Sequence, residues 1–374
     1  MLRTPRAQFA LLVVSTLFVG GMVGLERSVL PLLAEREFGV ASTAAALGFI
    51  ATFGVAKAAT NLFAGALADR VGRRAVLVAG WLVGLPVPLV VLTADRWEWI
   101  VAANVLLGLN QGMTWSMTIN MKIDIAGPAR RGVATGLNEA AGYVGVALLA
   151  GASAAVAARW GLRAPSWLGV AVALSGLALA LFARETRPEG SGLGAGPDGR
   201  GPGRASAEAG SGAGSGGLRA AFRASAGGDR VLGAASFAGL ATNLKDGVLW
   251  GLLPIALAAR GFGLGTIGLV AAAYPAAWGL AQLATGPASD RLGRRPLVVA
   301  GLGVQAAGVV GLAYAQQPAT ALAAAIVAGL GTALAYPTLQ AHVADLVAPR
   351  ARASALGAYR FWRDGGYVAG ALVA

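Results

Sequence analysis

The chain has 374 residues, of which 56% are hydrophobic and 13% are charged, and its formal net charge is +13. Because soluble domains carry about 25% charged residues, this composition excludes an ordinary water-facing globular surface. The sequence has no cysteine and one histidine, His342. We therefore expect no disulfide, no metal site, no cofactor and no Ser-His-Asp arrangement, and predict that the protein is not an enzyme.

Mostly apolar segments follow one another along the chain, and each is long enough to cross about 30 Å of hydrocarbon. We place these spans at 8–30, 42–66, 75–94, 98–120, 132–157, 163–182, 231–258, 265–287, 296–315, 319–343 and 353–374. The first follows Met1–Gln8 with no small-residue cleavage site, which indicates a retained helix. The sequence therefore predicts an all-α membrane protein.

A different composition separates the sixth span from the seventh. Residues 184–230 are rich in Gly, Ser, Ala and Arg and nearly lack large apolar side chains, which is typical of a flexible linker. We therefore predict a first half at 1–183, a linker at 184–230 and a second half at 231–374. We interpret the linker as a tether without a function of its own.

The positive charges predict how the chain lies in the membrane. Most of the 30 Lys and Arg residues fall in the N-terminal segment, the linker and the loops on that same side. This positive-inside pattern indicates a multi-pass protein of the plasma (inner) membrane, with its N-terminus and linker in the cytoplasm. The partner that it indicates is the lipid bilayer and not a nucleic acid.

The loop after the second span recurs in the second half of the chain. The first copy reads Gly65-Ala-Leu-Ala-Asp69-Arg70-Val-Gly72-Arg73-Arg74, and the second reads Gly286-Pro-Ala-Ser-Asp290-Arg291-Leu-Gly293-Arg294-Arg295. The offset from Gly65 to Gly286 is 221 residues, and the same offset takes Asp124 to Asp345 and Gly136 to Gly357. One offset that aligns separate loops predicts an internal duplication.

Both loops resemble the signature G-x-L-x-D-R-x-G-R-R/K of the major facilitator superfamily, with Ala288 in place of the leucine in the second copy. The resemblance covers essentially the whole chain and implies the major facilitator fold, in which two parallel six-helix halves are related by duplication. It also implies a monomer that moves a small-molecule solute by alternating access. Because the chain ends at Ala374 inside the eleventh span, we expect the last helix of the family to be missing.

In the family, the signature loop is thought to latch the cytoplasmic side in one state of the transport cycle. Glycines permit close approach in a tight turn, and Asp69 lies beside arginines at a helix end, where ion pairs can form and break. A second interpretation is that the arginines only set the topology. The candidate gating residues are Gly65, Asp69, Arg70, Gly72, Arg73, Arg74, Gly286, Asp290, Arg291, Gly293, Arg294 and Arg295.

Ionisable residues inside spans are costly and indicate function. Spans three and nine have none, and span six has one only at its first residue, Arg163. In the family these helices are peripheral whereas the others line the cavity. Helical spacing places the polar residues of the other spans on shared faces. The predicted cavity residues are Arg27, Lys57, Asn61, Asn104, Gln111, Trp115, Asn138, Asn243, Lys245, Trp250, Tyr274, Trp278, Tyr336, Gln340, Arg360, Arg363 and Tyr367.

Each charge inside a span has a second interpretation, an internal ion pair that fixes packing. Adjacent residues such as Lys245 and Asp246, or Arg363 and Asp364, point in different directions on a helix. We therefore expect their partners to come from other helices.

A buried carboxylate is the expected carrier of a coupled proton, since burial among apolar side chains favours the protonated form. Glu139 is the first candidate because its span is largely made of Ala, Gly, Val and Leu. Glu26 is the second, with a position at the cavity rim as the alternative, and Asp246 and Asp364 complete the set.

The predicted function is secondary active transport of a small polar or anionic solute, with proton coupling left open. Two departures from family patterns argue against a drug–proton antiporter. Gly108 stands where such members often carry an arginine four residues before a glycine, and the segment Gly136–Gly142 lacks a proline. Efflux of amphipathic drugs or metabolites is the alternative within transport, and a non-transporting membrane sensor on the same fold is the alternative outside it.

Overall fold

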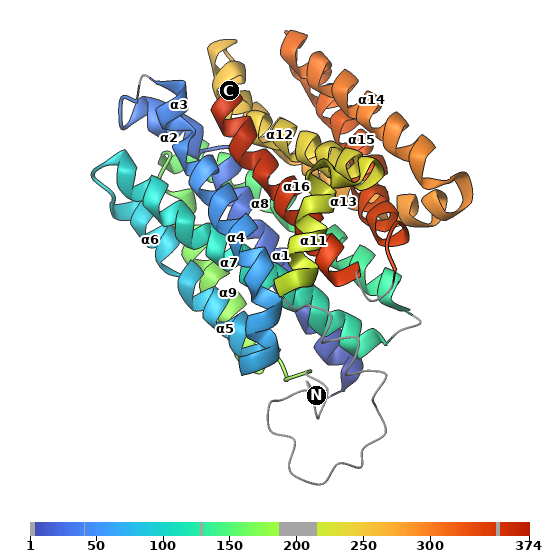
Figure 1. Ribbon diagram of the computed structural model, residues 1–374. Helices are drawn as coiled ribbons and strands as arrows, with labels where there is room; N and C mark the ends of the chain where they lie inside the picture. The colour runs from blue at the N-terminus through green and yellow to red at the C-terminus, as the bar shows by residue number, and fades with distance from the viewer. Residues whose placement is uncertain (1–3, 41, 128–129, 187–214, 349–351) are drawn as a thin grey trace.

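A computed structural model describes residues 4–40, 42–127, 130–186, 215–348 and 352–374, which form helices and no strand (Figure 1). The first half contains α1 (Pro5–Arg27), α2 (Leu30–Arg36), α3 (Thr43–Ala46), α4 (Gly48–Val71), α5 (Arg73–Gly84), α6 (Pro86–Thr93), α7 (Trp97–Ala126), α8 (Arg131–Trp160) and α9 (Pro165–Phe182). The rest contains α11 (Ser215–Arg223), the π-helix η2 (Ala224–Gly228), α12 (Arg230–Ala259), α13 (Leu264–Leu292), α14 (Arg294–Tyr314), α15 (Pro318–Asp345) and α16 (Arg352–Val373).

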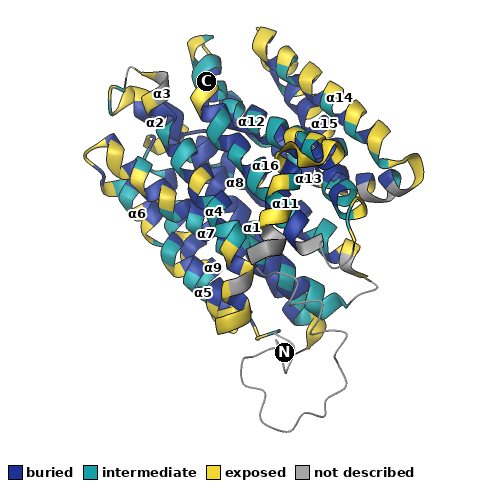
Figure 2. Cartoon of the chain, viewed as in Figure 1, coloured by how far each residue is buried: buried dark blue, intermediate teal, exposed yellow. Residues whose placement is uncertain are grey.

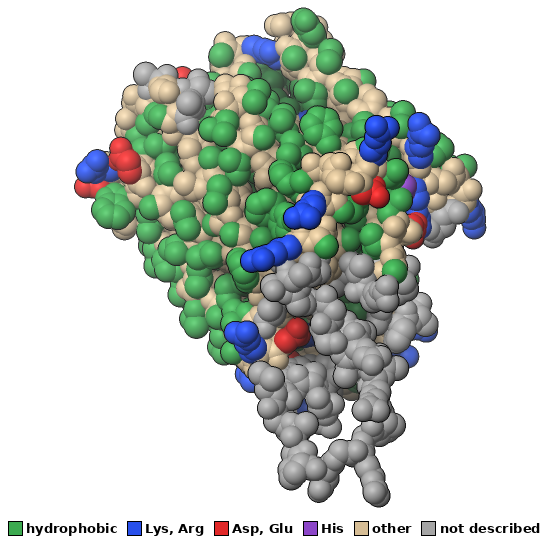
Figure 3. Space-filling view, in the orientation of Figure 1, with side chains coloured by type: hydrophobic (Ala, Val, Ile, Leu, Met, Phe, Trp, Pro, Cys, Tyr) green, Lys and Arg blue, Asp and Glu red, His purple; other side chains and the backbone are tan. Residues whose placement is uncertain are grey.

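Each predicted span corresponds to one long helix or to two consecutive helices, so the predicted all-helical fold is confirmed. The third span divides into α5 and α6 at Leu85, because Pro86 has no N–H to continue the hydrogen-bond ladder. The first span divides near Ser28, just before Pro31 in α2. Hydrophobic side chains cover most of the lateral face in view, and the residues between the helices are buried (Figures 2 and 3).

Four long helices are more polar than the rest. By length and composition, 7 of the described helical segments are apolar enough to cross a membrane, and α4, α7, α12 and α16 are not among them. Three of these four bury charged side chains inside the bundle: Lys122 on α7, Asp246 on α12 and Asp364 on α16. Such groups are tolerated in membrane helices when they face the protein interior. The polarity of these helices therefore points to an interior site.

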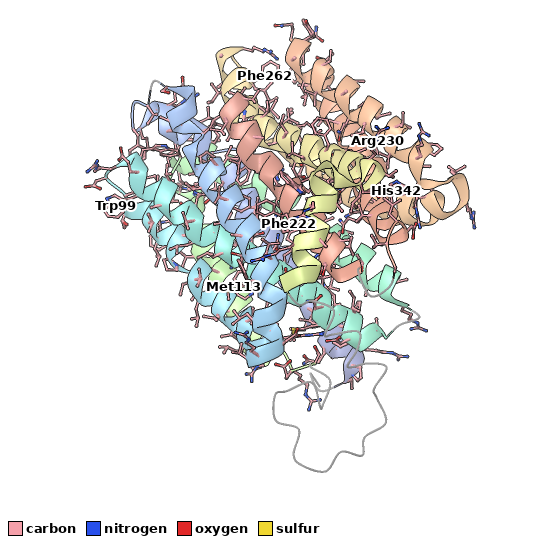
Figure 4. All side chains as sticks on the ribbon, viewed as in Figure 1. Trp99, Met113, Phe222, Arg230, Phe262 and His342 are labelled. Atoms are coloured by element: carbon pink, nitrogen blue, oxygen red, sulfur yellow. The ribbon has the colours of Figure 1, made fainter. Side chains whose placement is uncertain are left out.

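The last part of the predicted linker is helical, which differs from a linker that is flexible throughout. Residues 187–214 lie outside the described part of the chain, but α11 and η2 follow them, and α11 lies along α16 (Figures 1 and 4). The ring centroids of Phe222 and Phe361 are 5.1 Å apart, and the Trp362 indole N–H donates to Ser225 across 3.1 Å. The division of the chain into two halves and a linker stays a prediction.

Two pairs of helices join the halves, with α4 packed on α16 and α8 packed on α13. The duplication offset carries α4 onto α13 and α8 onto α16, so the two contacts are copies of one interface. Small residues make both contacts. A β-carbon added at Gly54 would lie 3.0 Å from the side chains of Tyr367 and Val368, and one added at Gly268 would overlap Ala154. Small residues let helix backbones approach closely in membranes.

The bundle is packed at one end and hollow at the other. We call the end that holds the start of α1 and both repeated loops the motif end, and the other the far end. At the far end, the rings of Phe49 on α4 and Trp250 on α12 have centroids 5.6 Å apart. At the motif end, a cavity of about 480 Å³ lies between α8 and α13–α15, and Val133 in its wall is 68% exposed. The described residues therefore leave a cavity at the motif end and pack aromatic side chains together at the far end.

Candidate functional site

A pocket at the centre of the bundle is lined by both halves. Its walls come from α4, α7 and α8 in the first half and from α15 and α16 in the second. The lining residues are polar or aromatic: Lys57, Asn61, Trp115, Ser116, Glu139, Tyr143, Tyr336, Gln340, Arg360 and Arg363. All of them except Ser116 and Tyr143 are among the residues predicted from the sequence. Neighbours of Glu139 and Tyr336 in the chain, Leu137 and Pro337, line the cavity at the motif end.

Asp364 is the centre of a hydrogen-bond network that joins the halves. Its carboxylate accepts from the Arg363 guanidinium at 2.9 and 2.7 Å, from Asn61 at 2.6 Å and from Asn243 at 3.3 Å. Arg363 also donates to the Tyr336 hydroxyl across 2.6 Å. A buried ion pair is retained when its remaining polar atoms are hydrogen-bonded. The charges of Arg363 and Asp364 therefore neutralise each other.

The carboxylate of Glu139 is buried and only half satisfied. Its Oε1 atom accepts from the indole N–H of Trp115 at 2.7 Å and from the side-chain amide of Asn138 at 3.3 Å. Its Oε2 atom is buried and has no hydrogen-bond partner among the described residues. Because buried polar atoms are rarely left without a partner, this oxygen is suited to a proton or to a polar group of a ligand.

Lys57 lies among three aromatic rings. Its ammonium nitrogen is 5.4 Å from the ring centroid of Tyr367, 5.5 Å from that of Phe53 and 5.6 Å from that of Trp115. These distances suit cation–π attraction. Within the described part of the chain, neither Lys57 nor Arg360 makes a hydrogen bond or an ion pair with a carboxylate. The pocket therefore carries two cations whose charge is not neutralised by direct contact.

Aromatic side chains form a continuous wall beside these charges. Tyr143 and Trp278 are stacked, with centroids 3.5 Å apart and planes inclined by 27°. Trp278 contacts Tyr336 at 4.9 Å, and Tyr143 contacts Trp115 at 5.6 Å. The first half supplies Trp115 and Tyr143, and the second supplies Trp278 and Tyr336, so the wall crosses the boundary between the halves.

A second polar network lies within the second half. The Lys245 ammonium donates to Asp246 and to Thr332, each at 3.0 Å, and also contacts the Tyr274 hydroxyl. Tyr274 in turn donates to the Asp246 carboxylate across 2.5 Å. None of these residues lines the central pocket. The network holds α12, α13 and α15 together.

The two repeated loops make equivalent ion pairs. Arg73, at the start of α5, pairs with Asp124 near the end of α7 and donates to the Asn120 carbonyl at 3.2 Å. In the second half, Arg294 pairs with Asp345 at 3.1 Å. The duplication offset carries the first pair onto the second. Each copy therefore ties its repeated loop to the end of an equivalent helix, α7 in the first half and α15 in the second.

Glu185 closes the first loop. Its carboxylate accepts the backbone N–H groups of Arg73 and Arg74, both at 3.1 Å, where the start of α5 favours an anion. Gly72 precedes them with φ of +96°, a conformation that glycine adopts at little cost.

The predicted gating residues differ in their surroundings. Gly65 was expected to make a close backbone contact, but a β-carbon there would meet nothing within 4 Å. Asp69 is exposed and makes no hydrogen bond or ion pair with another described residue. The side chain of Asp290 and the surroundings of Gly286 lie outside the described part of the chain.

The sequence profile of the Major Facilitator Superfamily matches residues 12–226 and 231–374. The chain belongs to this family. Major facilitator proteins are membrane transporters, and the predicted family is confirmed.

Curated relatives match a limited part of this major facilitator chain. The multidrug resistance protein MdtH of Aeromonas salmonicida is 34% identical over 121 residues, which are 30% of this chain and 29% of that protein. MdtH of Cronobacter sakazakii is 35% identical over 88 residues, which are 24% of this chain and 22% of that protein. The matched segments thus span less than a third of the length of these relatives.

Solved structures of major facilitator proteins share the fold over nearly the whole chain. A D-xylose–proton symporter covers 97% of this chain and 88% of its own, with a TM-score of 0.72 and 15% identity. A second match is a bacterial homologue of the human lysosomal transporter Spinster, in an inward-facing and unoccupied conformation. The match covers 98% of this chain and 81% of that chain, with a TM-score of 0.72 and 16% identity. The match to the human organic anion transporter MFSD10 covers 99% of this chain and 93% of that chain, with a TM-score of 0.65 and 18% identity.

Two predicted cavity residues of this major facilitator protein are packing residues. Asn104 and Gln111 share a helical face, but both are fully buried outside the pocket. Asn104 donates to the Ile100 carbonyl of its own helix at 3.1 Å, and Gln111 donates to the Val19 carbonyl on α1 at 2.8 Å. Their shared face is therefore the face that packs in the interior of the first half.

The charges of the first span lie near the far end. Arg27 is buried over the ring of Trp250, with its guanidinium carbon 5.2 Å from the centroid. Glu26 faces a crevice between α1, α6 and α9, lined in part by Val87 and Gly169, and does not reach the central pocket. Glu26 is buried there, so its assignment as a proton carrier or as a residue at the cavity rim stays a prediction.

The expectation that adjacent charges find their ion-pair partners on other helices was wrong. Lys245 pairs with Asp246, and Arg363 with Asp364, each with its neighbour in the chain. Long flexible side chains of consecutive residues can fold back toward one another although their Cα–Cβ bonds diverge. Other helices contribute neutral groups to these pairs, such as Asn61 and Thr332.

The sequence prediction missed Lys122 and Tyr143. Lys122 was assigned to a loop, but α7 continues to Ala126 and the lysine is 0% exposed. Its position seven residues after Trp115 was the available signal, since that spacing puts both side chains on one helical face. Tyr143 lies four residues after Glu139 and follows the same rule.

Proposed function

We propose that this transporter moves a small organic anion through the central pocket. The observation that carries the proposal is the unbalanced charge of the pocket. Lys57 and Arg360 line it without a direct anionic partner, whereas Arg363 is neutralised by Asp364. Charge-assisted hydrogen bonds to a carboxylate or phosphate of the solute would satisfy both cations. Trp115, Tyr143 and Tyr336 would then contact the rest of the solute.

Alternating access is the mechanism that we propose. The described arrangement is open at the motif end and packed at the far end. In the opposite arrangement, the halves would close at the motif end, which brings α8 toward α13 over the present cavity. The ion pairs of Arg73 and Arg294 lie at that end and would be remade during closure.

Glu139 is the group that we propose to carry a coupled proton. Its carboxylate lies in the pocket and has one oxygen without a described partner. Asp364 and Asp246 are less suited, since each is held by an adjacent cation. Glu26 lies outside the pocket.

The positive-inside pattern supports a motif end in the cytoplasm of a cell with an inner membrane. The motif end carries the repeated loops with their arginines and the start of the chain. We propose that the protein acts as a monomer, because both walls of the pocket come from one chain.

Ligand-induced thermal stabilisation of the purified protein tests the anion proposal. A ligand that binds only the folded state stabilises it by about 2.7 kcal/mol at a hundredfold excess over Kd. We expect stabilisation by organic acids or phosphate esters, lost in Lys57→Met and Arg360→Gln and kept in Arg159→Gln, an exposed arginine at the far end. Stabilisation by neutral solutes alone, or unchanged binding in both pocket variants, would refute an anionic substrate.

Efflux of amphipathic drugs is the second candidate function. The aromatic wall from Trp115 to Tyr336 favours it, and so does the local likeness to MdtH, a multidrug resistance protein. In the same assay, a response to amphipathic cations that is lost in Glu139→Gln but kept in Lys57→Met would favour this function over the first.

A further inference from the structure

A chain of hydrogen bonds runs from Lys122 to Glu139. The Lys122 ammonium donates to the Thr16 hydroxyl at 2.6 Å. That hydroxyl lies 3.3 Å from the Asn138 side-chain oxygen, and the Asn138 amide donates to Glu139 Oε1 at 3.3 Å. Thr16 can also donate to the Leu12 carbonyl at 2.7 Å. Starting at Lys122, every link can donate toward the next, and the last acceptor is the carboxylate.

Lys122 is a buried lysine whose described hydrogen bonds go to neutral oxygen atoms. Its side chain is 0% exposed, and its described hydrogen bonds go to Thr16 and to the Leu12 carbonyl at 3.2 Å. A buried charge without an opposite charge is strongly unfavourable. The hydrogen-bond chain through Thr16 and Asn138 connects Lys122 to the Glu139 carboxylate without direct contact. An ionised Glu139 would therefore be the counter-charge of a protonated Lys122 across these polar groups.

We propose that Lys122 is a positioning residue that holds Glu139 ionised, through Thr16 and Asn138, with Oε2 directed to the pocket. This inference rests on the proposed coupling role of Glu139. Asn138 makes the chain unsuitable as a proton path, because a side-chain amide does not readily exchange its protons. The chain instead biases the charge of the carboxylate at its end.

The same turn of α7 also holds the motif loop. Arg73 donates to the carbonyl of Asn120 and pairs with Asp124, and Lys122 lies between these two positions. A movement of the α4–α5 loop would therefore displace the segment that carries Lys122. The position of the α4–α5 loop at the motif end would therefore influence the charge of Glu139 through Lys122.

Other charged or titratable groups also face Glu139 from the elements packed around it. They are Lys57 from α4, Tyr143 from its own helix, Tyr336 from α15, and Arg360 and Arg363 from α16. A test of Lys122 must therefore leave these groups in place.

Infrared titration of the full-length protein in detergent tests this inference without a transport assay. The carboxyl band of Glu139 is the band that is present in the unchanged protein and absent from Glu139→Gln. We expect Lys122→Met to raise the pH midpoint of this band by about one unit, because removal of a nearby cation favours the protonated carboxyl. Thr16→Val should raise it less, in the same direction.

Thr118→Val is the matched control, since Thr118 is buried on α7 and its hydroxyl donates, among the described residues, to the Trp115 carbonyl of its own helix. An unchanged midpoint in Lys122→Met overturns the proposal, as does an equal shift in Thr118→Val. If Lys122→Met does not fold, an unchanged midpoint in Thr16→Val overturns it.

Proton coupling is tested separately, by transport in Glu139→Gln. If pH-dependent transport persists there while the infrared midpoint shifts in Lys122→Met, the coupling role of Glu139 fails and the influence of Lys122 on its charge stands.

Discussion

Trp115 donates its indole N–H to Glu139 Oε1 across 2.7 Å, which places the first candidate for proton coupling against the aromatic wall of the pocket. Protonation of that carboxylate would weaken the hydrogen bond and free the indole to move. The same residue pair can therefore link the charge of the site to its shape.

Replacement of Trp115 by phenylalanine should destabilise the protein. The variant keeps an aromatic ring but leaves Oε1 with only the longer hydrogen bond from Asn138. Hydrogen bonds to charged groups contribute about 1.5–3 kcal/mol to stability. We therefore expect the free energy of unfolding to fall by that amount at a pH where Glu139 is ionised. Thermal unfolding in detergent measures it, with Trp99→Phe as the control, since Trp99 is 59% exposed at the start of α7 (Figure 4). Equal losses in both variants would contradict a specific contribution from Glu139.

Substitution of Glu139 by glutamine should remove the dependence of transport on a pH gradient. The amide keeps the size of the side chain and can still accept from Trp115, but it cannot carry a proton. Uptake into vesicles with and without an imposed gradient measures the effect. Glu26→Gln is the control, because Glu26 lies outside the central pocket. A variant that still responds to the gradient as the original protein does would reject Glu139 as the carrier.

The two copies of the motif ion pair should differ in strength. Arg73 and Asp124 are 18% and 21% exposed, whereas Arg294 and Asp345 are 23% and 55% exposed. We expect Asp124→Asn to cost about 1–3 kcal/mol, between exposed and fully buried pairs, and Asp345→Asn less than about 1 kcal/mol. Thermal unfolding compares the two variants directly. A larger loss for Asp345→Asn would show that exposure does not govern these pairs.

Asp69→Asn should slow transport while leaving the present arrangement as stable as before. Asp69 makes no described hydrogen bond or ion pair here, so the latch role that we propose for it would belong to the state closed at the motif end. Transport rate and unfolding temperature are the two measurements, and membrane insertion is the control. Full transport activity in this variant would reject the latch and leave only a topological role for the loop.

Gly268→Val should open the far end. A larger side chain there overlaps Ala154, so the packed arrangement of α8 and α13 becomes strained. The chain has no cysteine, and single substitutions such as Phe49→Cys can therefore report access without further changes. Phe49 is 0% exposed. We expect the rate of thiol labelling of Phe49→Cys to rise about tenfold when Gly268→Val is added, which corresponds to a change of about 1.4 kcal/mol in the free energy of opening. Labelling of Val133→Cys, at the motif end, should fall; a rise at both positions would indicate unfolding instead.

The long apolar segments and the single duplication offset were sufficient to predict a duplicated helical bundle, and the resemblance of the signature loops supplied the major facilitator arrangement of its halves. Most pocket residues could be predicted for a related reason, since a charge such as Lys57 or Arg363 is tolerated in a span only where it faces the interior. Helical spacing was less informative. It cannot tell a face that lines a pocket from one that packs on another helix, and Asn104 and Gln111 belong to the second kind.

Lys122 escaped prediction because a lysine near the end of an apolar segment usually marks the edge of the membrane. Its burial depends on Thr16 and Leu12, which are distant in the sequence. The pairing of Arg363 with Asp364 depends likewise on rotamers that spacing does not determine. These features follow from tertiary packing and not from local pattern.

The glycine-rich contacts between the halves also bear on how fast the transporter can cycle. Side chains that interlock must change rotamer before two surfaces can slide, and each change adds to an activation barrier. At Gly54, and where Gly268 meets Ala154, there is little to disengage. Movement of one half on the other would therefore be slowed mainly by the contacts that do interlock, such as the stack of Tyr143 on Trp278 and the hydrogen bond from Asn61 to Asp364.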